Sequence, residues 1–348
     1  MASVLFAAPT LANAGYTFID LGTLGGLNSQ AFAINNSGQV VGWSNPAGST
    51  AKHATLWNGT TATDLGIKGS PYSRAFAVNN SGQAVGDNYS LGSATLWNGA
   101  TPTNLYTMYS ARSINNTGQI VGQASNHAAI WNGTTTTFLS NLGGNDSSAN
   151  GINFSGQIVG YSGTADFKAN HAVLWDGTTM TDLGTLGGAF SVALAINDLG
   201  KIVGWSNPVG STDIHAALWN GTATIDLGTL GGTTSGARAI NNAGAIVGFS
   251  TTIGDAAVHA TLWHGNVATD LNTLLDATAI STGWVLNQAY GINDSGWIVG
   301  DASNSITGQQ HAFLLSVATV PEPGTYAMIL AGLGLIGFKA RRRKEGIA

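Results

Sequence analysis

Ile34-Asn35-Asn36-Ser37-Gly38-Gln39-Val40-Val41-Gly42 is a phrase that occurs, with small changes, seven times in this chain of 348 residues. The later copies begin at Val78, Ile114, Ile152, Ile196, Ile240 and Ile292. Successive copies start 36 to 52 residues apart. Repeats of this length are typical of stacked supersecondary units, such as propeller blades or solenoid turns.

One repeat is expected to hold four antiparallel strands. In the first repeat these lie at residues 30–34, 39–44, 53–57 and 60–65. The last two strands flank Asn58-Gly59, the residue pair that best fits a two-residue hairpin turn, because such a turn needs positive φ at both central residues. Four short strands in 36 to 52 residues match a propeller blade.

The two ends of the repeat array complement each other. The seventh repeat stops after its third strand, residues 311–315, whereas residues 16–21 form a fourth strand with no repeat before it. Joining them completes the last blade, which removes the exposed edges of an open array. The sequence therefore predicts an all-β fold in which residues 15–317 form a seven-bladed β-propeller, closed by pairing of the N- and C-terminal strands, with a short C-terminal apolar helix after it.

Composition supports the all-β prediction and excludes some functions. The chain has 49 glycines, too many for long helices, and only 8% charged residues, where about 25% is usual. Residues 15–320 hold 15 aspartates, no glutamate and seven lysines or arginines, so this part would repel nucleic acid. Cysteine is absent, which excludes disulfides, a thiol nucleophile and thiolate metal sites.

The chain ends predict export. Residues 1–14 are an apolar stretch that ends in Ala12-Asn13-Ala14, which fits a signal peptide whose basic start is missing from this sequence. Residues 318–324 form a Pro-Glu-Pro linker, and residues 325–348 hold an apolar helix and a basic tail. The apolar run spans about 20 Å, less than the roughly 30 Å hydrocarbon layer, but flanking basic side chains could snorkel and hold it in a membrane.

This C-terminal order resembles the PEP-CTERM sorting signal of Gram-negative bacteria. The residues that carry the resemblance are Val320, Pro321, Glu322, Pro323, Arg341, Arg342 and Arg343. The resemblance implies an exosortase-like processing enzyme as a partner and contact with the membrane through the helix before processing. It also implies a final location at the cell envelope, the cell surface or the extracellular matrix, often with exopolysaccharide production, as in a biofilm.

The repeat phrases resemble the HAF-repeat family of extracellular proteins over residues 16–317. The carrying motifs are His-Ala-x-Leu-Trp, Asp-Leu-Gly-Thr-Leu-Gly-Gly and Ile-Asn-Asn-x-Gly-Gln-Ile-Val-Gly. The resemblance implies an extracellular setting, but it does not indicate which activity to expect. Four positions depart from the pattern: Ser93 replaces the histidine, Asn104 and Phe138 replace the aspartate, and Leu315 replaces the tryptophan.

Repeated histidines and aspartates are the first candidate ligands of a metal. One histidine occurs in the third strand of most repeats, as at His53, and one aspartate ends most fourth strands, as at Asp64. A structural reading is favoured for both, with histidine as a hydrogen-bond partner and aspartate as a turn cap. Calcium is the alternative for the aspartates, although no D-x-D-x-D-G loop occurs. We therefore expect no metal site and no cofactor.

Positions that break the repeat are better candidates for ligand binding. No G-x-S-x-G, H-E-x-x-H or P-loop motif occurs, so no catalytic residues are assigned. Trp284 lies in the longest insertion, residues 275–288, while Trp43 and Trp205 each precede a Ser-Asn-Pro loop. Exposed tryptophans could stack on sugar rings, and the alternative is that they pack between blades.

The leading hypothesis is an exported, envelope-anchored or released, non-enzymatic surface or matrix protein. It would bind extracellular polysaccharide or a surface protein through propeller loops, and nucleic acid is not an expected partner. The rival is a glycan-active hydrolase or lyase with non-repeated carboxylates at the channel mouth, and a third reading is a purely structural scaffold. The rival's candidates are Asp87, Asp146, Asp166, Asp213 and Asp301.

Overall fold

The structure is a computed structural model that describes residues 15–66, 70–90, 92–221 and 223–317. Tyr16–Ser316 form one compact unit. The predicted signal peptide and the predicted linker, apolar helix and basic tail after residue 317 lie outside the described residues. Within the described ranges strands are the main secondary structure and helix is almost absent, as the repeat predicts. No helix in these ranges is long and apolar enough to cross a membrane.

Each repeat forms a four-stranded antiparallel meander, whose strands we number first to fourth in chain order. The first strands are β2 (Gly25–Ile34), β6 (Ser73–Val78), β10 (Ser110–Ile114), β14 (Gly143–Ile152), β18 (Gly187–Ile196), β22 (Gly231–Ile240) and β26 (Trp284–Ile292). The second strands are β3 (Gln39–Pro46), β7 (Gln83–Asn88), β11 (Ile120–Ala124), β15 (Ile158–Thr164), β19 (Ile202–Pro208), β23 (Ile246–Thr252) and β27 (Ile298–Asn304).

The outer half of each meander holds the third and fourth strands. The third strands are β4 (His53–Asn58), β8 (Ser93–Asn98), β12 (His127–Trp131), β16 (Asn170–Asp176), β20 (His215–Asn220), β24 (Val258–His264) and β28 (Gln310–Val317). The fourth strands are β5 (Thr61–Asp64), β9 (Thr101–Leu105), β13 (Thr136–Phe138), β17 (Thr179–Gly184), β21 (Ala223–Asp226) and β25 (Val267–Asp270). The last repeat takes β1 (Tyr16–Asp20), which pairs with β28.

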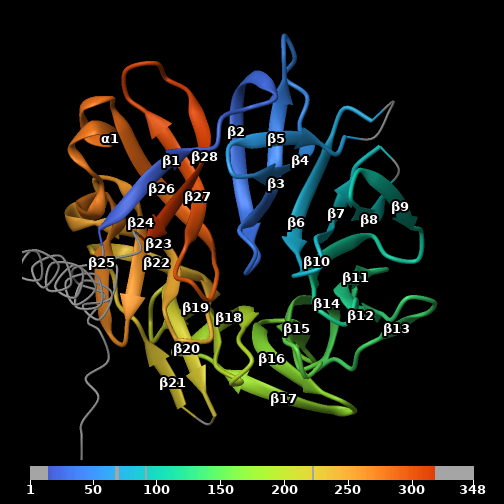
Figure 1. The fold of residues 1–348 in the computed structure, drawn as a ribbon. Helices are drawn as coiled ribbons and strands as arrows, with labels where there is room; N and C mark the ends of the chain where they lie inside the picture. The colour runs from blue at the N-terminus through green and yellow to red at the C-terminus, as the bar shows by residue number, and fades with distance from the viewer. Residues whose placement is uncertain (1–14, 67–69, 91, 222, 318–348) are drawn as a thin grey trace, which may run out of the picture. The chain divides into compact units, whose positions relative to one another are not determined.

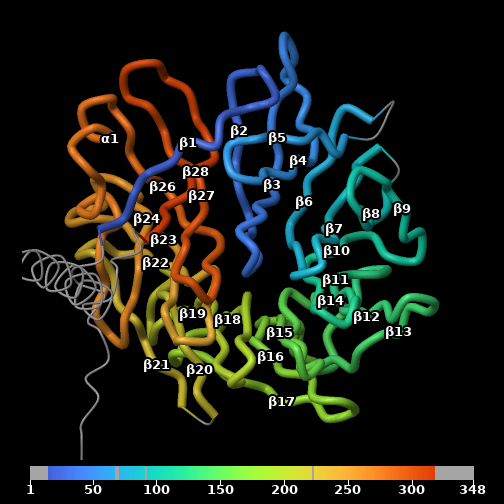
Figure 2. Tube along the Cα trace, in the orientation of Figure 1, coloured from blue at the N-terminus to red at the C-terminus, as the bar shows by residue number. Residues whose placement is uncertain are grey.

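The meanders follow one another around a common centre. Figure 1 shows them in chain order, with blue β1 and β2 beside the orange and red strands β26 to β28, and Figure 2 traces the same path along the backbone. The chain ends meet through several bonds. Leu21 donates its N–H to the carbonyl of Ala312 at 3.0 Å, and Ala312 donates its own N–H to the Ser29 hydroxyl at 2.9 Å.

The core lies between neighbouring meanders, where each sheet face packs on the next. The third-strand tryptophans Trp57, Trp97, Trp175, Trp219 and Trp263 are at most 2% exposed. The third strand of every repeat carries an alanine next to or near its start that is completely buried, at Ala54, Ala94, Ala128, Ala172, Ala216, Ala260 and Ala312. One core cluster joins Leu21, Ala31 and Trp57 to Val299 and Ala312, so the first and last repeats share it. Burial of large apolar side chains at these junctions supplies about 1.5–3 kcal/mol each.

The insertion before the last repeat contains helical turns that the repeat pattern does not predict. A 3₁₀ helix spans Leu271–Leu274 and the helix α1 spans Ala277–Ser281, while another 3₁₀ turn occurs at Ile253–Asp255. Asp276 caps α1, because its carboxylate accepts the N–H of Ala279 at 2.7 Å. Asp270 caps the preceding turn in the same way, through the N–H of Asn272 at 2.9 Å.

Candidate functional site

Each first strand carries a β-bulge at the same place. In β2, Ala31 pairs with Gly42 and Ala33 pairs with Val41, so that Phe32 between them has no partner of its own. The same register shift occurs in every other first strand. The bulge residues are Phe32, Phe76, Arg112, Asn150, Leu194, Arg238 and Tyr290. Bulges often redirect a side chain toward a binding site.

Small residues on both sides allow the bulge. The residue before it is alanine in every repeat, and the residue after it is alanine, serine or glycine. The glycine opposite belongs to the repeated Val-Gly pair. A Cβ atom at Gly160 would overlap the carbonyl oxygen of Ser148, and the other Val-Gly glycines meet an equivalent carbonyl. The repeated phrase therefore encodes two backbones in close contact at the bulge.

The bulge residues surround a cavity of about 450 Å³ at the centre of the meanders. Ser148 and Val192 from first strands and Gln123, Tyr161 and Trp205 from second strands complete its lining. We call this space the channel cavity. Its volume lies within the usual range for small-molecule sites, about 300–1,000 Å³.

The repeats differ most where they face the channel cavity. At the bulge the side chain changes from phenylalanine to arginine, asparagine, leucine and tyrosine, although the residues on both sides hardly change. The second-strand position after Val-Gly also varies, from Trp43 and Trp205 to Gln123 and Tyr161. A structural role would favour the same residue in every repeat, as the buried alanines illustrate. The variation therefore makes this cavity the candidate site, because its lining does not share the symmetry of the repeats.

Arg238 is the most constrained side chain of the cavity lining. Its guanidinium lies over the rings of Phe249 and Tyr290, 5.2 and 5.5 Å from their centroids. Its Nε is buried without a hydrogen-bond partner, and one terminal nitrogen donates to Gln288 at a long 3.4 Å. Burial lowers the pKa of Arg238, and the nearby charge of Asp301 acts in the opposite direction. The guanidinium stays charged, since arginine does not lose its proton in proteins.

A buried network holds Tyr290 beside Arg238. Gln30 donates from Nε2 to the Tyr290 hydroxyl at 2.9 Å and to Asp301 at 3.2 Å, and it accepts from the indole of Trp43 at 3.0 Å. Asp301 also accepts from Gln310 at 2.7 Å and from Asn287 at 3.2 Å. Burial, followed by the charge of Asp301, raises the pKa of Tyr290. Tyr290 therefore keeps its proton at neutral pH.

A second network fixes the opposite part of the lining. Tyr161 donates to Asp146 at 2.8 Å, and Gln123 donates to the other oxygen of the same carboxylate at 3.0 Å. Burial and the hydrogen bond to Asp146 raise the pKa of Tyr161 to about 12. Asp87 lies on β7 near Arg112 and Arg74, and burial raises the pKa of its carboxyl although both arginines favour its charged form.

A ring of asparagines lies three residues beyond the bulge of each repeat. Each side-chain amide donates to the main-chain carbonyl of the next asparagine, at 2.9 to 3.2 Å, and Asn293 returns this bond to Asn35. The members of this Asn ring are Asn35, Asn79, Asn115, Asn153, Asn197, Asn241 and Asn293. Each carboxamide oxygen also accepts main-chain N–H groups of its own turn, as Asn197 does from Lys201 at 2.9 Å. The ring lines a smaller space of about 200 Å³.

We expect Asn197→Ala to lower the free energy of unfolding by about 1–3 kcal/mol, because it removes one of the two donors to the buried carbonyl of Asn241 and the acceptor of two N–H groups in its own turn. Urea unfolding checks this value. Leu199→Ala is the control in the same turn, since Leu199 is 70% exposed and should change stability by less than about 0.5 kcal/mol. Equal effects of the two substitutions would contradict a structural role for the ring.

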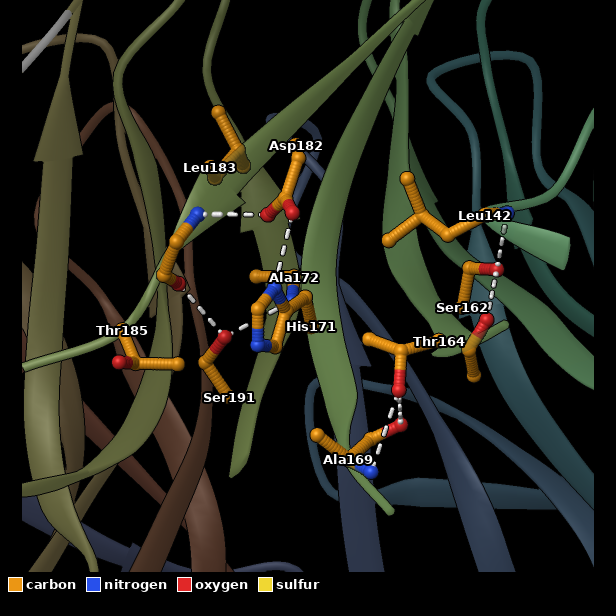
Figure 3. A network of polar contacts seen from close by, with 12 residues as sticks. Leu142, Ser162, Thr164, Ala169, His171, Ala172, Asp182, Leu183, Thr185 and Ser191 are labelled. Atoms are coloured by element: carbon orange, nitrogen blue, oxygen red, sulfur yellow. Dashed lines mark hydrogen bonds and ion pairs between the residues drawn. The ribbon is translucent and has the colours of Figure 1, made fainter. Parts of the chain in front are cut away.

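The repeated histidines and aspartates pair with each other. His171 donates from Nδ1 to Asp182 at 2.8 Å, and Asp182 caps its turn by accepting the N–H of Gly184 at 2.8 Å (Figure 3). Ser191 of the next repeat accepts the N–H of Ala172 at 2.8 Å and so joins two meanders. The same pair links His53, His215, His259 and His311 to Asp64, Asp226, Asp270 and Asp20. Both residue types thus have a structural partner in these repeats.

Two repeats lack the histidine–aspartate pair. Where Ser93 replaces the histidine, Asn104 replaces the aspartate, and where Phe138 replaces the aspartate, His127 packs edge-on against its ring at 6.0 Å. Among the described residues no group of three or more histidines or carboxylates could hold a metal ion.

The three candidate tryptophans occupy different places. Trp205 lines the channel cavity. Trp43 lies on β3 at 5% exposure, under the ammonium of Lys52 and bonded to Gln30, so it supports the lining from behind. Trp284 begins β26 and packs on Phe18 and His311, at 5.6 and 5.3 Å between ring centroids. Their role in ligand binding stays a prediction.

The five candidate aspartates also separate into two sets. Asp87, Asp146 and Asp301 stand behind the cavity lining, each in a different repeat, where neutral or cationic side chains of that region contact them. Asp166 and Asp213 lie in exposed loops and bond within those loops. The residues of the predicted sorting signal lie outside the described part of the chain.

Sequence reasoning missed the bulge residues. Their signal is present in the pattern Ala-x-small-Ile-Asn, where one position varies widely between an invariant alanine and a small residue. If the strand is predicted without a bulge, the side chain at this position has no distinctive orientation. Its variation then resembles that of an ordinary exposed residue.

Comparison with known proteins bears mainly on the C-terminal segment. A search of curated proteins finds no match. Solved structures with a similar backbone include an X-ray structure of a protein provisionally assigned as a gluconolactonase, which is 8% identical, with a TM-score of 0.41 over 88% of this chain and 93% of that one. A likeness this weak carries no argument. Residues 319–344 match the PEP-CTERM protein-sorting motif. This match confirms the predicted sorting signal and implies export to the surface of a Gram-negative bacterium and processing by an exosortase.

Proposed function

We propose that the chain is an exported, non-enzymatic binding protein of the cell surface. Its body, residues 15–317, would be a closed seven-bladed β-propeller that binds a polysaccharide segment in its channel cavity. The Asn ring supports closure, because its bonds run through all seven repeats and return to the first. Pairing of β1 with β28 supports the same arrangement, since it gives the last repeat a fourth strand. The HAF-repeat resemblance agrees with an extracellular setting and stays a prediction.

One observation supports the binding function most. The sequence of the strands and turns repeats, whereas the residues that line the cavity differ from repeat to repeat. Aromatic faces from Phe32, Phe76 and Trp205 can contact the apolar C–H face of a sugar ring. Neutral hydrogen-bonding groups, such as Gln123 and Asn150, can serve its hydroxyls. This mixture of apolar surface and a few directed polar groups is typical of small-ligand sites.

A glycan array probed with the full-length protein tests this function. We expect saturable binding to a subset of polysaccharides. Trp205→Ala should weaken that binding at least tenfold, because it removes an aromatic face from the cavity. Trp284→Ala is the matched control outside the cavity and should leave binding within about twofold, while thermal unfolding verifies that both variants fold.

The competing readings give different results in the same experiment. Loss of binding on Trp284→Ala but not on Trp205→Ala would move the site to the insertion. Shortening of a bound glycan during incubation would favour the hydrolase or lyase. A protein that binds no glycan at all would contradict the proposed function and favour a scaffold or a protein partner.

A further inference from the structure

The charge of the channel cavity differs from that of the rest of the molecule. Two of its lining side chains are charged, Arg112 and Arg238, and both are positive. None of its lining residues is acidic. Residues 15–320 as a whole hold more than twice as many aspartates as lysines and arginines. An acidic body that presents only cations inside its cavity is suited to an anionic ligand.

Carboxylates of the protein do not neutralise these two arginines directly. Among the described residues, the ion pairs within 4.0 Å all involve histidine and aspartate, and none involves an arginine. Asp301, the acidic residue nearest in the Arg238 network, is held instead by the amides of Gln30, Asn287 and Gln310. Arg112 is exposed, whereas Arg238 is partly buried. A partly buried guanidinium without an ion partner is costly, and an anion bound at Arg238 would lower that cost.

The geometry of Arg238 favours a planar anion. Its guanidinium carbon lies 5.2 and 5.5 Å from the ring centroids of Phe249 and Tyr290, and these two contacts restrict the movement of the side chain. Arginine binds a carboxylate with two parallel N–H···O bonds, and a stacked guanidinium is already oriented for them. Arg112 is similarly oriented over the ring of Phe76, at 4.9 Å.

We propose that the channel ligand is an acidic glycan, whose carboxylates bind Arg112 and Arg238 while its sugar rings lie against the aromatic lining. This proposal rests on the proposed function and names its ligand class. The hydroxyls of the sugar would bond to Gln123, Ser148 and Asn150, which line the same cavity. Sugar hydroxyls both donate and accept hydrogen bonds, and so do these three side chains.

Calorimetry on the full-length protein tests the proposal with uronate oligosaccharides and their methyl esters. The ester has nearly the same size and the same hydroxyls but carries no charge. We expect the free acid to bind at least tenfold more tightly than the ester. Arg238→Gln and Arg112→Gln should each weaken binding of the acid at least tenfold and change binding of the ester by less than about twofold.

Lys201→Gln is the control for loss of one positive charge, because Lys201 belongs to the turn of the Asn ring and not to the cavity lining. It should leave both affinities unchanged. Equal affinities for the acid and the ester would overturn the proposal of an acidic ligand but would still be consistent with a glycan-binding cavity. The same holds if the arginine variants lose affinity for the acid and the ester equally. Failure of every acid, ester and neutral glycan to bind would contradict the proposed function itself, and this inference with it. Urea unfolding establishes that each variant is folded.

Discussion

Gly160→Ala is expected to destabilise the protein by about 3 kcal/mol or more, one of the largest effects of a single methyl group in this fold. The added Cβ would overlap the carbonyl oxygen of Ser148 and lie 2.9 Å from its carbonyl carbon. Both are main-chain atoms of β14, so relief requires β14 and β15 to separate at the bulge. Urea unfolding of the full-length protein measures the change.

Gly163→Ala is the matched control for this substitution. Gly163 lies on the same strand, β15, but a Cβ there would meet nothing closer than 3.4 Å. Both variants gain the same stabilisation from a less flexible unfolded chain, about 0.4–1 kcal/mol. The difference between them therefore isolates the close approach at the bulge. A Gly160→Ala protein as stable as the control would mean that the two strands are not held in this register.

A chain that begins at Gly22 should lose several kcal/mol of stability, because it lacks β1. Tyr16 and Leu21 are only 6% and 2% exposed, and burial of such side chains contributes about 1.5–3 kcal/mol each. Removing β1 also exposes the edge of β28 and leaves His311 without Asp20. Thermal and urea unfolding of this variant check the loss.

A synthetic peptide of residues 15–21, added to the shortened chain, should restore part of the lost stability by adding a strand to the free edge. A peptide with Leu21→Asp should not, because its charge would enter a buried position. Asp20→Ala in the full-length chain keeps β1 but removes its ion pair with His311. It should lower the free energy of unfolding by less than about 1 kcal/mol, since Asp20 is 34% exposed. A shortened chain as stable as the intact one would contradict closure through the chain ends.

The strands could be predicted because each depends on local sequence. Residues 53–57 alternate and precede Asn58-Gly59, and the structure places β4 at His53–Asn58. The first strand begins earlier than predicted, at Gly25, because Gly25 pairs with Pro46, the last residue of β3. The helix α1 was missed because its signal is one capping aspartate in an insertion that has no repeat.

The candidate site was harder to predict because it depends on register and on distance between repeats. Histidine and aspartate were each recognised as structural, but their pairing joins positions 11 residues apart that only the hairpin brings together. The paired departures at Ser93 and Asn104 are the sequence signal of that contact. The channel cavity depends on seven bulges, and a bulge is a property of two strands, which one strand's sequence does not reveal.

The bulge also separates specificity from folding. Because residues such as Leu194 have no partner in the strand ladder, exchanging their side chains leaves the paired backbone in place. The seven bulge positions therefore form a set of interchangeable sites on a constant frame. Selection, or a combinatorial library limited to these positions, could alter the surface of the channel cavity without rebuilding the protein around it.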